Sequence, residues 1–236
     1  MNNLPSNIPV IAIDGPSASG KGSVAELVAE HLGFHYLDSG AIYRIVAYAS
    51  QQNQIAWGNA EAIAKLTAQL HIEFSHGNIL LNGSNITAEV RSEEMGRGAS
   101  EVAVHPAVRH ALLDLQKQFR QLPGLVGDGR DMASVVFPDA ILKIFLTAGV
   151  EIRAQRRYQQ LLNRGLEANY ETILQDLQAR DLRDSQRSAA PLKQMPDALL
   201  LDTSDKSIQQ AVKFVLDAYQ KSLDSYKKSQ LSYKKT

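Results

Sequence analysis

Five short apolar runs, widely spaced along the 236-residue chain, most constrain how it can fold. They are Val10–Asp14, Phe34–Asp38, Leu125–Asp128, Ile141–Leu146 and Ala198–Asp202. Most lack a strict alternation of polar and apolar residues, which is typical of strands buried on both faces of a parallel sheet. Helical patterns separate the runs, such as the stripe of Val24, Leu27, Val28 and Leu32 before a capping Gly33. This alternation predicts an α/β sandwich with a five-stranded parallel sheet, and aspartates end four of the five strands.

Composition excludes several classes of protein. Cys is absent, which excludes disulfides, thiolate chemistry and cysteine-ligated metals. Lys plus Arg equals Asp plus Glu at 25 each, so the basic excess of a nucleic-acid or membrane-surface binder is missing. No apolar run approaches the roughly 18 residues that span a bilayer, and the first nine residues do not resemble a secretion signal. We therefore expect a cytoplasmic protein with no nucleic-acid or membrane partner. The six His form no close metal-ligand pair, so no protein-built metal site is expected.

One stretch interrupts the strand–helix alternation. His71–Phe74 and Asn78–Gly83 read as short strands joined by a turn at residues 76–78. The Asn82-Gly83 pair favours a second turn, which makes Ile86–Val90 a candidate third strand. The sequence thus predicts a small antiparallel unit inserted between helices.

The first apolar run leads directly into a glycine-rich loop followed by an amphipathic helix. The loop consists of Gly15, Pro16, Ser17, Ala18, Ser19, Gly20, Lys21, Gly22 and Ser23. Gly15 and Gly20 permit backbone angles that point successive N–H groups inward, and Lys21 can reach the β- and γ-phosphates of a nucleotide. A turn that only joins strand to helix is the alternative, but the strand before, the Lys within and the helix after favour phosphate binding. Gly22 stands where the strict pattern has Ser or Thr, so we expect Mg²⁺ to be held through waters.

Two further segments follow predicted strands, at the same edge of the sheet as the loop. Leu37–Arg44 places Asp38-Ser39-Gly40 just past a strand, with Arg44 in position to meet a second anionic substrate. The alternative is helix capping by Asp38 or Ser39, and capping is expected for Ser39. Gly127–Asp131 carries two carboxylates flanking an arginine, which suits ribose, base, metal or phosphate binding. A turn with a weak surface salt bridge is the alternative there.

The third segment, Arg180–Arg187, belongs to an arginine-rich stretch. Asp176, Arg180, Asp184 and Arg187 are spaced to share one face of a helix. Every basic residue between Ile144 and Leu192 is an arginine, and arginine is preferred for forked contacts to phosphate oxygens. These residues are Arg153, Arg156, Arg157, Arg164, Arg180, Arg183 and Arg187. An ordinary solvated helix would show the same charge ladder, and both interpretations remain open.

The loop and the three segments, in this order, resemble the bacterial cytidylate kinase family over about Val10–Tyr219. The resemblance implies a three-layer P-loop kinase sandwich of the nucleoside monophosphate kinase type, with an antiparallel insert and a short Arg-rich lid. It implies a core of residues 8–66 and 108–221, a lid at about 153–169 and a nucleotide-binding insert at 67–107. Residues 222–236 are then a polar tail, either a frayed helix end or a flexible segment.

The resemblance also implies the reaction, which is transfer of the ATP γ-phosphoryl group to CMP or dCMP in the presence of Mg²⁺. The loop would bind ATP together with Arg156 or Arg157, between which the repeated arginines do not decide. The implied CMP-binding residues are Ser39, Tyr43, Arg44, Ser100, Arg109, Arg130, Asp131, Arg180, Asp184 and Arg187. The catalytic candidates are Lys21, Asp128, Arg130 and Arg187. A monomer with small-molecule partners is expected.

Within the CMP-binding set, the resemblance places Arg44, Arg130 and Arg187 on the acceptor phosphate. It places Ser100, Arg109 and Asp131 on the cytosine, and Arg180 and Asp184 on the sugar. Taken alone, a serine such as Ser100 is more typical of a helix cap.

Two other functions remain open from the residues alone. The first is a different small-molecule P-loop kinase, acting on UMP or on a non-nucleotide alcohol, although three arginines aimed at one acceptor phosphate argue against an uncharged acceptor. The second is a nucleotide-gated binding module that hydrolyses ATP slowly and signals through a partner.

Overall fold

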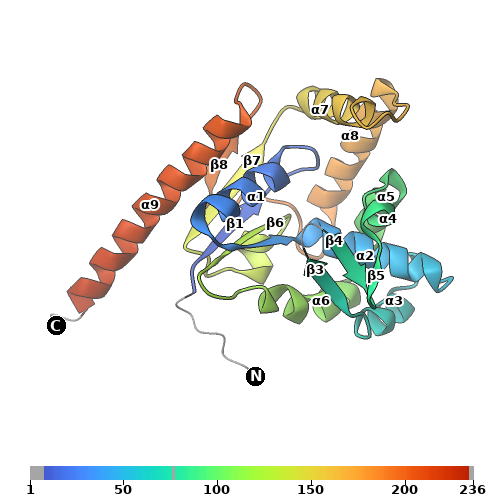
Figure 1. Cartoon of the computed structure of the whole chain (residues 1–236), viewed down its shortest axis with the longest axis horizontal. Coiled ribbons are helices and arrows are strands. Elements are labelled where there is room, and N and C mark those ends of the chain that lie inside the picture. The colour runs from blue at the N-terminus through green and yellow to red at the C-terminus, as the bar shows by residue number, and fades with distance from the viewer. Residues whose placement is uncertain (1–7, 76–77, 234–236) are drawn as a thin grey trace. The chain divides into compact units, whose positions relative to one another are not determined.

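A computed structural model describes residues 8–75 and 78–233 of the chain (Figure 1). The chain divides into two compact units. Unit 1 consists of Met1–Leu37, Phe119–Gln186 and Ala190–Thr236, and unit 2 of Asp38–Gln118 and Arg187–Ala189. Unit 2 is therefore larger than the insert expected at 67–107. Across the described ranges, none of the helices is both long and apolar enough to cross a membrane.

The sheet of unit 1 is built from the five predicted runs. Its strands are β1 (Val10–Asp14), β2 (His35–Asp38), β6 (Leu125–Gly129), β7 (Leu142–Thr147) and β8 (Leu199–Asp202). Their order across the sheet is β2-β6-β1-β7-β8. The central β1 is buried along its whole length and pairs in parallel with β6 and β7, with Ile13 opposite both Asp128 and Ile144. The predicted five-stranded parallel sheet is confirmed.

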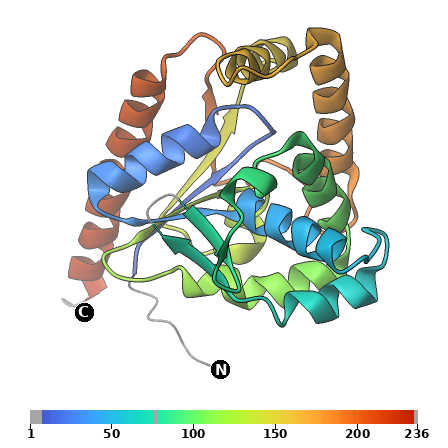
Figure 2. The ribbon, with the colours of Figure 1, turned by 45° about the vertical axis from the view of Figure 1, so that its right-hand side comes forward.

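The helical elements of unit 1 are α1 (Lys21–Leu32), the π-helical segment η1 (Met132–Val136), α7 (Val150–Leu162), α8 (Tyr170–Gln186) and α9 (Ile208–Tyr233). Helix α1 ends at Gly33, whose φ of 64° is the left-handed conformation that glycine adopts without strain, as predicted. Helices α1 and α9 lie side by side against the sheet (Figure 1, Figure 2). Val28 and Val215 from these helices share a buried core with Ile13 and Ile144.

The predicted polar tail is a continuation of α9. The helix extends as far as Tyr233, and residues 234–236 lie outside the described part of the chain. Hydrogen bonds between side chains four residues apart support this stretch, such as Gln220 to Asp224 at 3.1 Å. The described part of the predicted tail is therefore helical and belongs to α9.

Unit 2 combines helices with a small sheet. Its elements are α2 (Ser39–Gln52), α3 (Ala60–Thr67), β3 (Ile72–Ser75), β4 (Asn78–Leu81), β5 (Ser84–Asn85), α4 (Thr87–Val90), α5 (Glu93–Val102) and α6 (Pro106–Gln118). The three strands are antiparallel in the order β3-β4-β5. Ile79 and Leu81 of β4 pack against Ile45 of α2 in the core of this unit. Helix α2 also lies along α5, as Figure 2 shows.

The third strand of the insert is not where the sequence predicts it. Asn82 and Gly83 form the predicted turn, with φ angles of 50° and 81°, and the strand that follows is Ser84–Asn85. Ile86–Val90 was predicted as a strand, and this prediction is wrong because Thr87–Val90 is helical. The Asn85 carboxamide oxygen accepts hydrogen bonds from the Thr87 amide at 3.0 Å and the Thr87 hydroxyl at 2.7 Å, which turns the chain into a helix. The turn predicted at 76–78 includes residues 76 and 77, which lie outside the described residues.

Candidate active site

The glycine-rich loop of unit 1 joins the buried end of β1 to the N-terminus of α1. Gly20 is the N-cap residue of α1 and has a φ of 92°, and Ala18 also lies in the left-handed region with a φ of 59°. Because Gly20 has no side chain, the first amide groups of α1 are left without a side-chain cap. Such a loop at a helix N-terminus is an anion-binding arrangement. The hydroxyl of Ser19 is buried there and, among the described residues, has no hydrogen-bond partner.

Gly15 is required for a different reason from the predicted one. We expected it to adopt an unusual backbone angle, but its φ is not in the left-handed region. Instead, a Cβ at this position would lie 1.9 Å from the carbonyl oxygen of Leu146 in the adjacent strand β7. The glycine permits a close approach of two backbones, so the prediction of a conformational role is wrong for Gly15 and right for Gly20.

Lys21 lies beside a buried carboxylate at the end of β6. Its Nζ is 3.8 Å from Oδ2 of Asp128, and the two side chains are 13% and 4% exposed. The Tyr36 hydroxyl donates a hydrogen bond of 2.8 Å to the other oxygen of Asp128. Asp128 is therefore fixed by Tyr36 and in turn holds the ammonium group of Lys21 next to the loop.

Arg130 follows the same strand and is held rigidly. Its Nε donates to Asp184 Oδ2 at 2.7 Å, and its Nη2 donates to the Ser17 hydroxyl at 2.6 Å. Burial opposes the positive charge, but Asp184, Asp128 and Asp14 more than offset it and raise the pKa of Arg130. The guanidinium is thus a fixed positive charge in contact with the phosphate loop. It is not part of an exposed surface salt bridge, which was the alternative interpretation.

Asp14, the last residue of β1, organises the chain after Arg130. Its two carboxylate oxygens accept the amide N–H groups of Met132 and Ala133, both at 2.8 Å, at the start of η1. The pKa of Asp14 is raised to about 6: burial is the largest cause and Asp131 adds to it, while the two amide hydrogen bonds and Arg130 act in the opposite direction. Asp14 therefore connects the backbone that follows Arg130 and Asp131 to the end of β1, where the phosphate loop begins.

The raised pKa of Asp14 predicts a pH dependence of stability. The folded protein holds this proton more tightly than the unfolded chain, in which the pKa is 3.8. The stabilising contribution of Asp14 is therefore fully present below pH 4 and is lost as the pH rises through about 6. We expect the free energy of unfolding of the wild type, relative to Asp14→Asn, to fall by roughly 2.5 kcal/mol between pH 4 and 7, at 1.36 kcal/mol per pKa unit. Urea unfolding at several pH values measures this difference.

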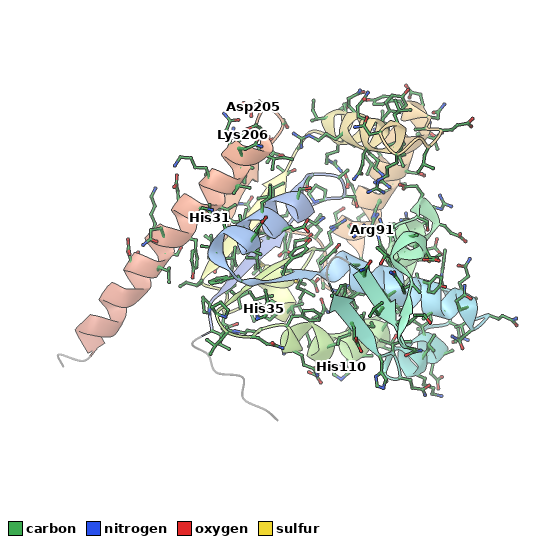
Figure 3. All side chains as sticks on the ribbon, viewed as in Figure 1. His31, His35, Arg91, His110, Asp205 and Lys206 are labelled. Atoms are coloured by element: carbon green, nitrogen blue, oxygen red, sulfur yellow. The ribbon has the colours of Figure 1, made fainter. Side chains whose placement is uncertain are left out.

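Asp205→Asn is the matched control for this measurement. Asp205 lies in the loop before α9, next to Lys206 (Figure 3), and it is fully exposed. A hydrogen bond from Lys206 lowers the pKa of Asp205. We therefore expect the free energy of unfolding of the wild type, relative to Asp205→Asn, not to fall between pH 4 and 7. A difference between wild type and Asp14→Asn that is flat from pH 4 to 7 would contradict the assignment.

The arginine-rich helix α7 contacts the loop, and α8 packs against α7. Arg156 donates to the backbone carbonyl of Ser19 at 3.3 Å and to the hydroxyl of Thr203 at 3.1 Å. Arg157 instead hydrogen-bonds to Gln160 on its own helix. Arg180 and Asp184 both lie on α8, which ends at Gln186. Arg187 is therefore not on the predicted common helical face, because the helix ends one residue before it.

In unit 2, α2 and α6 bring together two of the predicted acceptor residues. The guanidinium carbon of Arg109 lies 5.5 Å from the ring centre of Tyr43, and Arg109 also donates to the Ala103 carbonyl at 3.1 Å. Arg44, next to Tyr43 on α2, donates to the carbonyls of Val90 and Ser92 at 3.0 and 2.8 Å. Tyr43 and Arg109 form a stacked pair, while Arg44 is held at the end of α4.

The two serines predicted in unit 2 do not cap helices. Asp38 caps α2 by accepting the Ala41 amide at 2.9 Å, whereas the Ser39 hydroxyl donates to Gln116 at 2.9 Å. Asp38 occupies the N-cap position and Ser39 is the first residue of the helix, so capping by Ser39 is wrong. Ser100 lies inside α5 and is 5% exposed, and within the described ranges its hydroxyl has no hydrogen-bond partner. Capping is therefore wrong for Ser100 as well.

Among the residues that the structure describes, no group of three or more His, Cys, Asp or Glu side chains is arranged to hold a metal ion. The histidines are spread over separate elements, with His31 on α1, His35 on β2 and His110 on α6 (Figure 3). Two of the histidines contact backbone carbonyls: His105 contacts the Trp57 carbonyl at 2.7 Å, and His35 contacts the Leu122 carbonyl at 2.9 Å.

Comparison with known proteins decides the family. A family model described as cytidylate kinase matches residues 11–221. The chain belongs to the cytidylate kinase family. It is 58% identical to the cytidylate kinase of Polynucleobacter asymbioticus over 217 residues, covering 92% of this chain and 99% of the relative. It is 57% identical to that of Paraburkholderia phymatum over 212 residues, covering 90% and 93%.

A solved structure supports the fold of this cytidylate kinase family member. An uncharacterised protein from Eubacterium ventriosum aligns with a TM-score of 0.51 and 11% sequence identity, covering 90% of this chain and 98% of its own. At this identity the likeness concerns the fold alone. The family membership rests on the sequence relatives.

Several residues that hold the phosphate loop or a candidate site residue in place were not assigned a role from the sequence. Asp14, Tyr36 and Thr203 each hold a loop or a candidate residue in place, and Arg153 and Asp181 form an ion pair with a shortest N–O distance of 2.5 Å. Some signals existed, since Asp14 is one of the strand-ending aspartates and Arg153 belongs to the arginine-only stretch. Neither pattern predicts which residue Asp14 or Arg153 contacts, so these contacts could be identified only from the structure.

Proposed function

We propose that this protein transfers the γ-phosphoryl group of ATP to CMP or dCMP, which gives ADP and CDP or dCDP. Its family membership supports the reaction, because the two relatives described above are named cytidylate kinase. The observation that carries the proposal is the contact between Arg130 and Ser17, which places a fixed guanidinium against the phosphate loop. An arginine fixed beside bound phosphates is what phosphoryl transfer requires, since the reaction depends on positioning and charge neutralisation.

The donor nucleotide binds at the loop in this proposal. The amide groups of residues 15–20 and the N-terminus of α1 surround the β- and γ-phosphates, and Lys21 adds a positive charge. The hydroxyl of Ser19, which has no partner among the described residues, gains a phosphate oxygen as its acceptor. Arg156 or Arg157 adds a guanidinium group to the phosphates in this proposal, and Arg156 already contacts the loop through the Ser19 carbonyl.

The acceptor nucleotide binds through a second set of residues in this proposal. The cytosine is recognised by Ser100, Arg109 and Asp131, which offer both donors and acceptors to a polar base edge. The Ser100 hydroxyl is buried and has no partner in the described part of the chain, which supports this assignment. Tyr43 stacks with Arg109 at the same place. Ser39 completes the acceptor site through its buried hydroxyl, which now contacts Gln116.

The sugar and phosphate of the acceptor are assigned to charged residues. Arg180 and Asp184 hold the sugar, and Arg44, Arg130 and Arg187 hold the phosphate. Three guanidinium groups neutralise the charge of the acceptor phosphate and allow it to approach the γ-phosphate in line. The transfer is direct, without a covalent enzyme intermediate.

Mg²⁺ enters as part of the ATP substrate in this proposal. Gly22 has no hydroxyl for it, and the described residues provide no cluster of three ligands, so the ion is held chiefly by nucleotide phosphates and water. When bound, it neutralises charge on the phosphates. We also propose that the protein acts as a monomer in the cytoplasm, where ATP and CMP are found, since one chain supplies every assigned residue.

A panel of acceptors tests the proposed function. ADP release is followed with CMP, dCMP, UMP, AMP and shikimate at saturating ATP and Mg²⁺. We expect CMP and dCMP to be phosphorylated at least about tenfold more efficiently, in kcat/KM, than any other acceptor. A preference for UMP or shikimate would identify a different kinase. ATP turnover that no acceptor stimulates, with no binding of CMP by calorimetry, would identify a nucleotide-gated module.

A further inference from the structure

Two carbonyl groups of the phosphate loop are held by arginines of α7. Arg153 Nη1 donates to the Ser17 carbonyl at 3.1 Å, and Arg156 Nη1 donates to the Ser19 carbonyl at 3.3 Å. The two arginines are three residues apart and so project from the same face of the helix. The two carbonyl groups that the arginines hold are therefore two residues apart in the loop.

Each arginine is itself fixed by further hydrogen bonds. Both terminal nitrogens of Arg153 bind the carboxylate of Asp181 on α8, at 3.1 and 2.5 Å, and its Nε donates to the Ala148 carbonyl at 2.9 Å. This forked geometry fixes the plane of the guanidinium. The side chain of Arg153 is only 5% exposed, so solvent does not compete with these bonds.

Arg156 is fixed by Thr203, the residue that follows β8. It donates to both the hydroxyl and the carbonyl oxygen of Thr203. The Thr203 hydroxyl also lies 3.2 Å from the Ser19 carbonyl and 3.1 Å from the Thr147 carbonyl, as a donor to either. Thr203 is 4% exposed, and its amide donates to Thr147 at 2.9 Å. The Ser19 carbonyl is thus held by Arg156 and by a buried hydroxyl anchored to the sheet.

Fixing these two carbonyls fixes the amides that bind an anion. In a planar trans peptide the C=O of one residue and the N–H of the next point in opposite directions. The carbonyls of Ser17 and Ser19 therefore set the directions of the Ala18 and Gly20 amides. These are the two loop residues with left-handed backbone angles, at 59° and 92°, and a non-glycine residue such as Ala18 keeps this conformation only if its surroundings impose it.

We propose that Arg153, Arg156 and Thr203 form a carbonyl clamp that holds the phosphate loop in its anion-binding conformation. They are positioning residues, which act through the loop backbone. The clamp also connects the loop to α8, because Asp181, which holds Arg153, lies three residues before Asp184, which holds Arg130. The inference rests on the proposed binding of ATP at the loop.

The Thr203→Val variant tests the clamp, with Thr203→Ser as the conservative match. Valine keeps the shape of threonine but removes the hydroxyl, whereas serine keeps the hydroxyl. We expect Thr203→Val to raise the KM for ATP and the Kd for ADP, measured by calorimetry, by about tenfold, on the scale of one hydrogen bond to a buried group. The KM for CMP is expected to stay within about twofold, and Thr203→Ser is expected to behave as the wild type.

A merely structural role would change both substrates together and would show in the thermal midpoint instead. An unchanged Kd for ADP in Thr203→Val, or an equal rise in both KM values, overturns the clamp. If Thr203→Val does not fold, Arg153→Lys replaces it, because lysine keeps the charge but loses the fork, and the same split between ATP and CMP is expected. A wild type that phosphorylates none of the cytidine acceptors overturns the proposed function instead, while its Kd for ADP still decides the clamp.

Discussion

Replacing Lys21 with alanine is expected to lower kcat at least about a hundredfold, the scale of removing one electrostatic donor from a transition state. The Nζ of Lys21 lies at the phosphate loop, 3.8 Å from Oδ2 of Asp128, so the proposed donor site places its positive charge beside the phosphates. Phosphoryl transfer develops charge between the donor and acceptor oxygens, and a fixed cation there lowers the barrier. A coupled ADP-release assay at saturating ATP and CMP measures the effect.

The fold should tolerate this change. Asp128 keeps the hydrogen bond from Tyr36 at 2.8 Å, so the buried carboxylate still has a donor. Lys213→Ala is the control, because it also removes one positive charge, from a lysine that is 74% exposed and paired with Asp217 on the same helix. We expect the control to keep kcat within about twofold, because exposed pairs of this kind contribute little. A Lys21→Ala rate within about threefold of the wild type would exclude Lys21 from the mechanism.

The sheet could be predicted from the sequence because each strand is marked by its own short apolar run. A run such as Val10–Asp14 must be buried wherever it lies, and parallel strands need helical connections, so strand order and helix positions are tightly limited. The loop was equally readable, since Gly20 and Lys21 are needed at fixed places for reasons internal to the loop. The strand-ending aspartates were expected to gather polar chemistry at one edge. Two of them, Asp14 and Asp38, hold backbone amides there.

The contacts that depend on how elements meet could not be read from the sequence. The pairing of Arg153 with Asp181, or of Thr203 with Ser19, joins residues 28 and 184 positions apart. Helical periodicity shows which face a residue occupies but not which loop lies opposite. The short third strand of the insert was missed for a related reason, since Ile86–Val90 was interpreted as a strand and the two hydrogen bonds that Asn85 accepts from Thr87 turn the chain into a helix there. The meeting of Arg44, Arg130 and Arg187 on one phosphate stays a prediction.

Gly15→Ala is expected to destabilise the protein by about 3 kcal/mol or more, the upper range for inserting a group into a well-packed backbone. The added Cβ would lie 1.9 Å from the Leu146 carbonyl oxygen and 3.0 Å from the Leu146 carbonyl carbon, and neither atom belongs to a flexible side chain. Gly15 cannot move away easily, because its amide donates to the Gly129 carbonyl of β6 on the other side of β1 at 3.3 Å. The two central strand pairs of the sheet would therefore have to separate. Urea unfolding, or the soluble fraction on expression, measures the loss.

Gly58→Ala is the matched control, since a Cβ there meets no atom within 4 Å and the residue has no left-handed backbone angle. We expect its free energy of unfolding to stay within about 0.5 kcal/mol of the wild type, or to rise slightly because alanine restricts the unfolded chain. The contrast between the two variants isolates the close approach of β7 from the general effect of a methyl group. A Gly15→Ala variant as stable as Gly58→Ala would show that β1 and β7 can separate at the loop without cost. The close backbone approach would then not be the reason for glycine at position 15.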